Sequence, residues 1–164
     1  MKTILRRRIA LLISIAVPVI AGTAIIVFIG GCAGASGYLR ICDASTGRTY
    51  GAWPLADSGE FAIEFIHSVN QSPVRETYMA ADEKIRPLSV RFYSYGAGML
   101  SDLEGNRELG RDGDAMIISG FDTSFSKINL IVGTVSDHIL YINDEIVSLR
   151  DLCGRNAHIT IQYK

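Results

Sequence analysis

Hydrophobic residues follow two different patterns in this chain. Across Ile9–Ile29 they run almost without interruption, and no residue is charged. After residue 37, apolar and polar residues alternate with the period of two that places successive side chains on opposite faces of a β-strand. The first pattern predicts a membrane segment and the second a β-rich domain in water. We therefore divide the chain into a signal segment at residues 1–31, a short linker at 32–37 and a domain at 38–164.

Several stretches of the domain show the alternation clearly. One run predicts a shared strand face for Phe61, Ile63, Phe65, His67 and Val69, and the next run does so for Val74, Glu76, Tyr78 and Ala80. Asn143-Asp144 has the composition of a two-residue hairpin turn. Short strands separated by Gly, Pro, Asn and Asp predict an all-β fold, a small antiparallel sandwich or barrel-like domain. We expect the charged, glycine-rich residues 101–113 to form an exposed loop.

The uninterrupted segment has the length of a membrane helix, since about 20 residues rising roughly 1.5 Å each cross a bilayer core. It follows Lys2 and Arg6–Arg8, and the positive-inside rule keeps such a basic cluster in the cytoplasm. The domain is therefore expected at the cell membrane, outside the cytoplasm on the periplasmic or extracellular face, behind one N-terminal anchor.

Three fates remain open for the segment. It can stay in the membrane as a signal anchor, or it can be removed as a signal peptide, although its apolar core is longer than the usual ~7–15 residues. The string Ile29-Gly30-Gly31-Cys32 also resembles a bacterial lipobox, in which the cysteine becomes lipidated. Cys32 is thus a candidate lipidation site, and the alternative is a plain thiol at the membrane surface.

Charge and ligand spacing exclude some classes of function. After residue 31, 12 basic and 17 acidic residues leave a net charge of −5. A mildly acidic domain does not attract a phosphate backbone, so we do not expect nucleic acid as a partner. The His and Cys residues show no spacing typical of metal sites, so the sequence indicates no metal and no other cofactor.

Two cysteines lie within the domain, one in its first predicted strand and one just before the last. An exported compartment is oxidising, so Cys42 and Cys153 are candidates for a disulfide that ties the two ends of the domain together. Closing such a long loop would stabilise the fold by on the order of 3–4 kcal/mol. The alternative is a pair of buried free thiols, because the sequence gives no distance between them.

The hairpin around Asn70-Gln71-Ser72-Pro73 contains the main candidate site. A four-residue loop would place His67 opposite Glu76, with Cβ atoms roughly 5 Å apart on the core-facing side. Such a pair at the rim of the core could hold a ligand or an ion, with Glu76 setting the charge or tautomer of His67. The alternative is a structural hydrogen bond that fixes the register of the hairpin. A one-residue change of register would break the pair.

Two neighbouring features extend this candidate site. Tyr78 follows Glu76 on the same predicted face, and the turn containing Gly96 and Gly98 could let the backbone approach a ligand closely. Ser68 next to His67 suggests a hydrolase, but adjacent strand residues point to opposite faces, so His67 could not activate it in a regular strand.

These motifs resemble the family called domain of unknown function 1850. The resemblance rests on His67-Ser68-Val69 with Pro73-Val74 and Glu76-Thr77-Tyr78, and on Phe92–Met99, where the family typically shows a Phe-Gly-Ala-Gly-Leu-Pro run. It covers residues 38–163, with Tyr95 in place of Phe and Met99-Leu100 in place of Leu-Pro. It implies a small exported protein, commonly encoded beside permeases of the TAXI class of TRAP transporters. It supplies no catalytic residue.

TRAP transporters pair an ion-coupled permease with an exported solute-binding protein, so the resemblance implies an accessory role in solute uptake. We accordingly expect a membrane-tethered accessory or interaction protein, not an enzyme, whose partners are the membrane and a transporter permease or its solute-binding protein. The alternative is a β domain that binds a small ligand or an ion through His67, Glu76, Tyr78, Gly96 and Gly98. A hydrolase with His67 or Glu76 as base ranks last, because the sequence places no nucleophile beside them.

Overall fold

The structure, a computed structural model, describes residues 35–94 and 105–164, which all lie in one compact unit, Cys32–Lys164. The expected membrane segment Ile9–Ile29 and the lipidation candidate Cys32 lie outside the described residues. Within the part that is described, no helix combines the length and the apolar composition needed to cross a bilayer.

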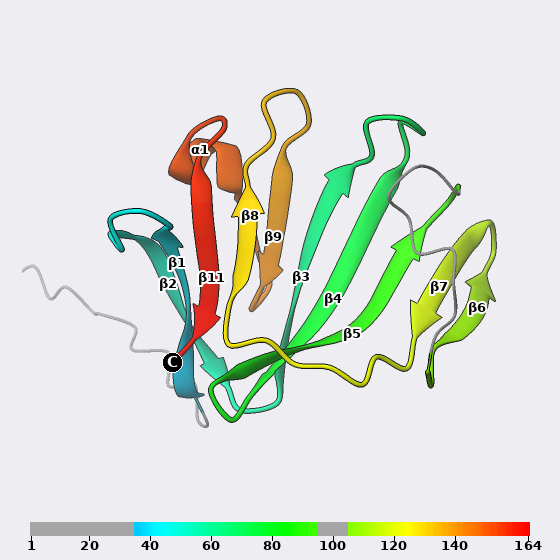
Figure 1. Cartoon of the computed structure of the whole chain (residues 1–164), viewed down its shortest axis with the longest axis horizontal. Helices are drawn as coiled ribbons and strands as arrows, with labels where there is room; N and C mark the ends of the chain where they lie inside the picture. Colours follow the sequence, from blue (N-terminus) through cyan, green and yellow to red (C-terminus); the bar gives the residue numbers. More distant parts are fainter. Residues whose placement is uncertain (1–34, 95–104) are drawn as a thin grey trace, which may run out of the picture. The chain divides into compact units, whose positions relative to one another are not determined.

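Alternating residues form two antiparallel sheets, which confirms the predicted all-β class (Figure 1). Of the described strands, four make up sheet A in the order β2-β1-β11-β8, and seven make up sheet B in the order β10-β9-β3-β4-β5-β7-β6. The strands of sheet A are β1 (Ala35–Asp43), β2 (Thr49–Ala56), β8 (Ile128–Ile131) and β11 (His158–Tyr163). Those of sheet B are β3 (Gly59–Ile66), β4 (Pro73–Ala81), β5 (Lys84–Phe92), β6 (Glu108–Asp112), β7 (Ala115–Ser119), β9 (His138–Ile142) and β10 (Glu145–Ser148). A short helix, α1 (Leu149–Cys153), follows β10.

The inner faces of the two sheets share one hydrophobic core. Every second residue of the paired strands β1 and β11 is apolar and buried, Leu39 and Ile41 on one strand and Ile159 and Ile161 on the other. Each fully buried aliphatic side chain contributes about 1.5–3 kcal/mol, so this interface holds the sheets together. Sheet B supplies the opposite side of the same cluster with Phe61, Ile63, Tyr78, Ala80, Ile85, Leu140 and Ile142.

A second apolar cluster lies on the same face of sheet B and contains no residue of sheet A. It consists of Val74, Phe92, Met116 and Ile118, with Phe65, Val90 and Phe121 packed against it. Because side chains alternate along β4, Val74 and Tyr78 share a face, and Glu76 stands between them. Sheet B therefore carries two apolar areas on its inner face, separated by one carboxylate.

The hairpin of β9 and β10 has the turn that its sequence predicts. Asn143 and Asp144 take φ angles of 48° and 63°, which are left-handed conformations that Asn and Asp tolerate well. Their neighbours Ile142 and Glu145 pair directly across the two strands. The prediction of a two-residue turn at this position is confirmed.

Two boundaries differ from those expected. Strand β6 occupies residues 108–112, so the prediction of a loop over 101–113 is wrong for these five residues. Every side chain of β6 is exposed, so neither face needed the apolar alternation that reveals a strand. Strand β1 begins at Ala35 and thus takes in the end of the segment expected as a linker.

The expected Cys42–Cys153 disulfide is not formed, and both residues are free thiols. Cys42 follows Ile41 on β1, so its side chain lies on the face opposite to that of Ile41, where it is buried as well. There its Sγ lies 3.6 Å from Thr49 Oγ1 and 3.7 Å from Gln162 Nε2. Cys153, at the end of α1, packs instead against the core cluster. The two sulfurs belong to opposite sides of sheet A, which explains why they do not pair.

Candidate functional site

The predicted pair of His67 and Glu76 does not form, because the hairpin has a different register. Strand β3 ends at Ile66, and residues 67–72 form a six-residue loop in place of the expected four. Glu76 lies opposite Ile63 instead. The shift of four residues preserves the alternation, so Glu76 still points to the inner face as predicted.

His67 organises the loop that it begins. Its backbone N–H donates to Ser72 O at 2.9 Å, and its carbonyl accepts from Gln71 N at 2.9 Å. Its ring Nδ1 faces the backbone N–H groups of Val69 and Asn70 at 3.3 and 3.4 Å, so a neutral ring carries its proton on Nε2. These contacts explain why the chain leaves the strand at this point and turns back into β4.

Glu76 finds its partner on its own strand. Tyr78 Oη donates to Glu76 Oε2 at 2.6 Å, and the ring of Tyr78 stacks on Phe61 with centroids 5.3 Å apart. Burial raises the pKa of the Tyr78 hydroxyl well above its usual value, and the charge and hydrogen bond of Glu76 raise it further. The structure thus brings together two residues of the expected site, whereas Gly96 and Gly98 lie outside the described residues.

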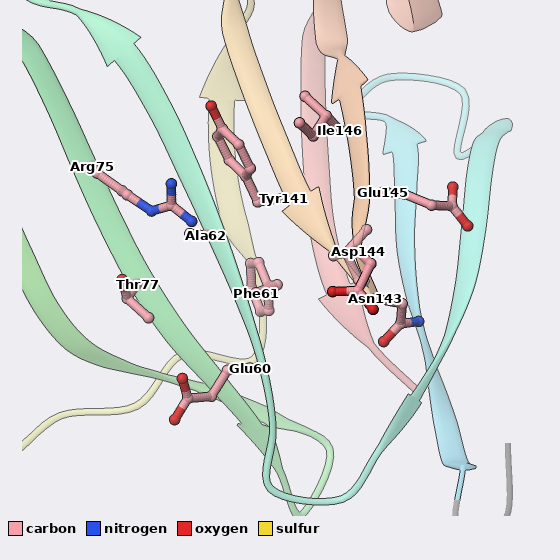
Figure 2. A pocket seen from close by; sticks show the side chains of 11 residues that line it. Glu60, Phe61, Ala62, Arg75, Thr77, Tyr141, Asn143, Asp144, Glu145 and Ile146 are labelled. Carbon is pink, nitrogen blue, oxygen red and sulfur yellow. The ribbon is translucent and has the colours of Figure 1, made fainter.

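One pocket, of about 390 Å³, opens on the outer face of sheet B beside the β9–β10 hairpin (Figure 2). Arg75 from β4 and Tyr141 from β9 reach across β3 here, over the small side chain of Ala62. The guanidinium of Arg75 lies 4.1 Å from the ring centroid of Tyr141 and 3.7 Å from Glu64 Oε2, and Tyr141 Oη donates to Glu64 Oε1 at 3.2 Å. The aromatic and cationic groups of this pocket therefore already bind one another.

A second pocket, of about 370 Å³, lies where the segment between β8 and β9 passes the end of β3. We call it the end pocket. The backbone N–H of Ile66 donates to Ser136 Oγ at 2.9 Å and joins the two segments. The apolar side chains that line the end pocket are Phe65, Ile66, Val135 and Ile139.

The carboxylates that line the end pocket are already engaged by protein groups. Asp137 Oδ1 accepts from the backbone N–H groups of His138 and Arg150 at 2.7 and 3.0 Å, and Asp137 Oδ2 accepts from Ser148 Oγ at 2.6 Å. Glu64 binds Tyr141, as described above. Ser148 Oγ also accepts from the backbone N–H of Asp151 at 3.0 Å and so caps the start of α1. This network fixes the position at which Arg150 enters the end pocket.

Arg150 is the charged group of the end pocket that keeps free donors. Its Nη2 donates to Val135 O at 2.8 Å, and its buried Nε has no hydrogen-bond partner among the described residues. None of the ion pairs between described residues includes Arg150. The neighbouring His138 adds no second cation at neutral pH, since burial lowers its pKa and the charge of Arg150 lowers it further, against the opposing effect of Asp137.

Exposed apolar side chains surround this end of the domain. Ile66, Val69 and Val135 are 43%, 65% and 93% exposed, and they stand on the end of β3, the 67–72 loop and the segment before β9. We call these three residues the apolar rim. Figure 1 shows the 67–72 loop and the segment before β9 at the end of the domain opposite to the C-terminus. Two of the three, Ile66 and Val135, line the same pocket, and exposed apolar groups that lie together are typical of surfaces that bind a partner.

No sequence pattern points to the end pocket. Val135 is a single apolar residue in a polar stretch, and Arg150 and Asp137 have no sequence spacing that suggests a site. One signal was present: Ser148 and Asp151 have the spacing of a helix N-cap and its acidic partner, which predicts the start of α1. Within residues 35–94 and 105–164, no three His, Cys, Asp or Glu side chains converge as metal ligands would.

Comparison with known proteins gives one match. The family model described as Domain of unknown function (DUF1850) matches residues 61–149. This span runs from β3 to the start of α1 and includes Glu76, Tyr78 and the apolar rim. It also includes every residue that lines the end pocket except Arg150, which directly follows the span. No curated protein and no solved structure matches the chain.

Proposed function

Because the matched residues make up more than half of the chain, this protein belongs to the DUF1850 family, and from that premise we propose that it is a membrane-tethered accessory protein of a solute transporter. In this role the domain binds a transporter component outside the cytoplasm and catalyses no reaction. The family resemblance described above suggests the partner, a permease of the TAXI class of TRAP transporters or its solute-binding protein.

The observation that carries the proposal is the apolar rim. Its most exposed member, Val135, keeps 93% of its side chain in contact with solvent. Burying a Val or Ile side chain in a partner contributes about 1.5–3 kcal/mol, so the two rim residues that line the end pocket, Ile66 and Val135, and Val69 on the adjoining loop can serve as the anchors of an interface.

The direction of the chain supports the same surface. Strand β1 begins at Ala35 beside Ala56, and Tyr38 N donates to Lys164 O at 2.6 Å, so the chain enters the domain next to its C-terminal strand. The apolar rim lies at the other end (Figure 1). The first described strand thus begins at the end of the domain that does not carry the rim.

The test is recovery of partners from native membranes. The full chain, tagged after Lys164, is purified in mild detergent as the wild type and as the double variant Val69→Asp/Val135→Asp. Ile146→Asp is the matched control, because Ile146 is 71% exposed but lies on β10 beside the outer-face pocket. The wild type and the control should recover a transporter permease or solute-binding protein, and the double variant should lose it.

Either of two results would overturn the proposal. If the wild type recovers no transporter component, the proposed partner is wrong. If the double variant recovers as much of it as the wild type, the apolar rim is not the binding surface. The compartment has a test of its own: a reporter enzyme that is active only outside the cytoplasm, fused after Lys164, should be active.

A further inference from the structure

We propose that the end pocket binds a small organic acid, a molecule with one carboxylate on an apolar group, and that Arg150 holds the carboxylate. This inference goes beyond the accessory role, since it rests on the pocket alone and holds whether or not the apolar rim meets a transporter. Three observations carry it: the size and walls of the pocket, the state of its carboxylates, and the unused donors of Arg150.

The walls determine the apolar part of the ligand. Ile66, Val135 and Ile139 converge on the pocket, and its volume of about 370 Å³ lies near the lower end of the ~300–1,000 Å³ that ligand pockets occupy. Apolar side chains around such a space favour a short hydrocarbon or aromatic group over a sugar or a nucleotide. The exposed Val135 lets the same wall reach the solvent, so a ligand can enter.

The charges determine the polar part. Asp137 and Glu64 line the pocket, but their oxygens already accept hydrogen bonds from protein donors or face Arg75. Engaged in this way, the two carboxylates have few lone pairs left to accept hydrogen bonds from a ligand. Arg150 has only one side-chain hydrogen bond to a described residue, so the group left to bind a ligand is a cation.

Arg150 is also well positioned to distinguish a carboxylate from an uncharged group of the same shape. Its backbone is held by Asp137, and its Nη2 is held by Val135 O, so both ends of the residue are fixed before a ligand arrives. A guanidinium presents its donors in a rigid planar fork that matches a carboxylate. Arg150 lines the pocket, and its Nη1 has no printed hydrogen bond to a described residue, so the fork keeps donors that a carboxylate could use.

The experiment uses the full chain in lipid nanodiscs with ¹³C-labelled isoleucine Cδ1 methyl groups. Hexanoate is titrated in, and hexanamide, which has nearly the same shape without the charge, is the comparison ligand. We expect saturable shifts of the Ile66 and Ile139 methyl signals with hexanoate, much weaker shifts with hexanamide, and little change at Ile159 and Ile161 in the core.

Variants then test the role of Arg150. Arg150→Gln should weaken hexanoate binding by about tenfold or more, the loss expected for a charge-assisted hydrogen bond, and should leave hexanamide unaffected. Arg155→Gln is the matched control, since Arg155 also donates to a carbonyl of the same segment, Thr134 O at 3.1 Å, but does not line the pocket. Arg155→Gln should bind hexanoate as the wild type does.

A further variant covers the case in which Arg150→Gln fails to fold. Val135→Asp changes a side chain that is 93% exposed, and it places a carboxylate at the mouth of the pocket, so it should weaken binding of hexanoate more than binding of hexanamide. The proposal is overturned if hexanoate causes no saturable shift at Ile66 and Ile139. It is also overturned if hexanoate and hexanamide bind equally well, or if a folded Arg150→Gln binds hexanoate as tightly as Arg155→Gln.

Discussion

Replacing Tyr78 with Phe removes a single hydroxyl from the inner face of sheet B and keeps the ring that stacks on Phe61. The lost group donates to Glu76 Oε2 at 2.6 Å, on a residue that is only 8% exposed. The change leaves the half-buried carboxylate of Glu76 between two apolar clusters without that donor. The variant therefore measures how much this hydrogen bond stabilises the Glu76 carboxylate on the inner face of sheet B.

The magnitude follows from the charge of the acceptor. A hydrogen bond to a charged group contributes about 1.5–3 kcal/mol, so Tyr78→Phe should lower the free energy of unfolding by about that amount. Glu76 lies opposite Ile63 and Val90, which are apolar. The double variant Glu76→Val/Tyr78→Phe removes both polar partners, so it should be clearly less destabilised than the sum of the two single variants.

The assay is urea unfolding of the full chain in detergent, followed by the fluorescence of Trp53, the single tryptophan. The raised pKa of Tyr78 adds a second readout, because the unfolded chain loses this proton from about pH 10 while the folded chain keeps it. The contribution of the Tyr78 hydroxyl to the free energy of unfolding is complete below that pH and is lost as the pH rises. Tyr78→Phe should therefore reduce the decline of the free energy of unfolding at alkaline pH. A cost below about 0.5 kcal/mol, or strictly additive single variants, would refute the reasoning.

Three further changes test the surroundings of α1. Ser148→Ala should lower the free energy of unfolding by about 1 kcal/mol or more, because it removes the N-cap and a donor to Asp137; urea unfolding measures it. Burial raises the pKa of the Cys153 thiol to about 11, so a thiol reagent at pH 8 should label it far more slowly in the folded chain than in urea. Burial lowers the pKa of His138, so its contribution to stability is complete above about pH 6.5 and is lost as the pH falls below that value; His138→Gln should reduce the loss of stability between pH 7.5 and 5.5.

The sequence predicts strands where one face is buried and the other is not. The alternation in β1, β3, β4 and β11 locates these strands because their inner faces meet the shared core. Strand β6 has no buried face, and β7 buries the adjacent residues Ala115 and Met116, so neither shows a period of two. Strand β2 has Leu55 as its one buried side chain, which is too little for a pattern.

Register is harder to predict than strand position, as the 67–72 loop shows. Val69 and His67 are in phase with Phe65, so the pattern alone allows β3 to continue past Ile66. Any even shift preserves the inner face of both strands, and the hydrogen bonds of the His67 backbone decide between them.

The candidate site divides in the same way. Glu76 and Tyr78 are two residues apart on one strand, so the sequence is sufficient to place them on one face. The end pocket joins Ile66, Val135 and Arg150, which are far apart in the chain. Only the tertiary arrangement of β3, the segment before β9 and α1 brings them together.

The pairing of β1 with β11 makes the order of synthesis matter for folding. Leu39 lies beside Tyr163, so the first described strand finds this neighbour only after all the other described strands have been synthesised. Until β11 arrives, β8 has no partner in sheet A, and the core side of β1 and β2 stays uncovered along that edge. Closing so long a loop is slow compared with forming a local hairpin. A nascent chain would thus spend much of its synthesis with these apolar strands open to chaperones, to proteases or to other chains.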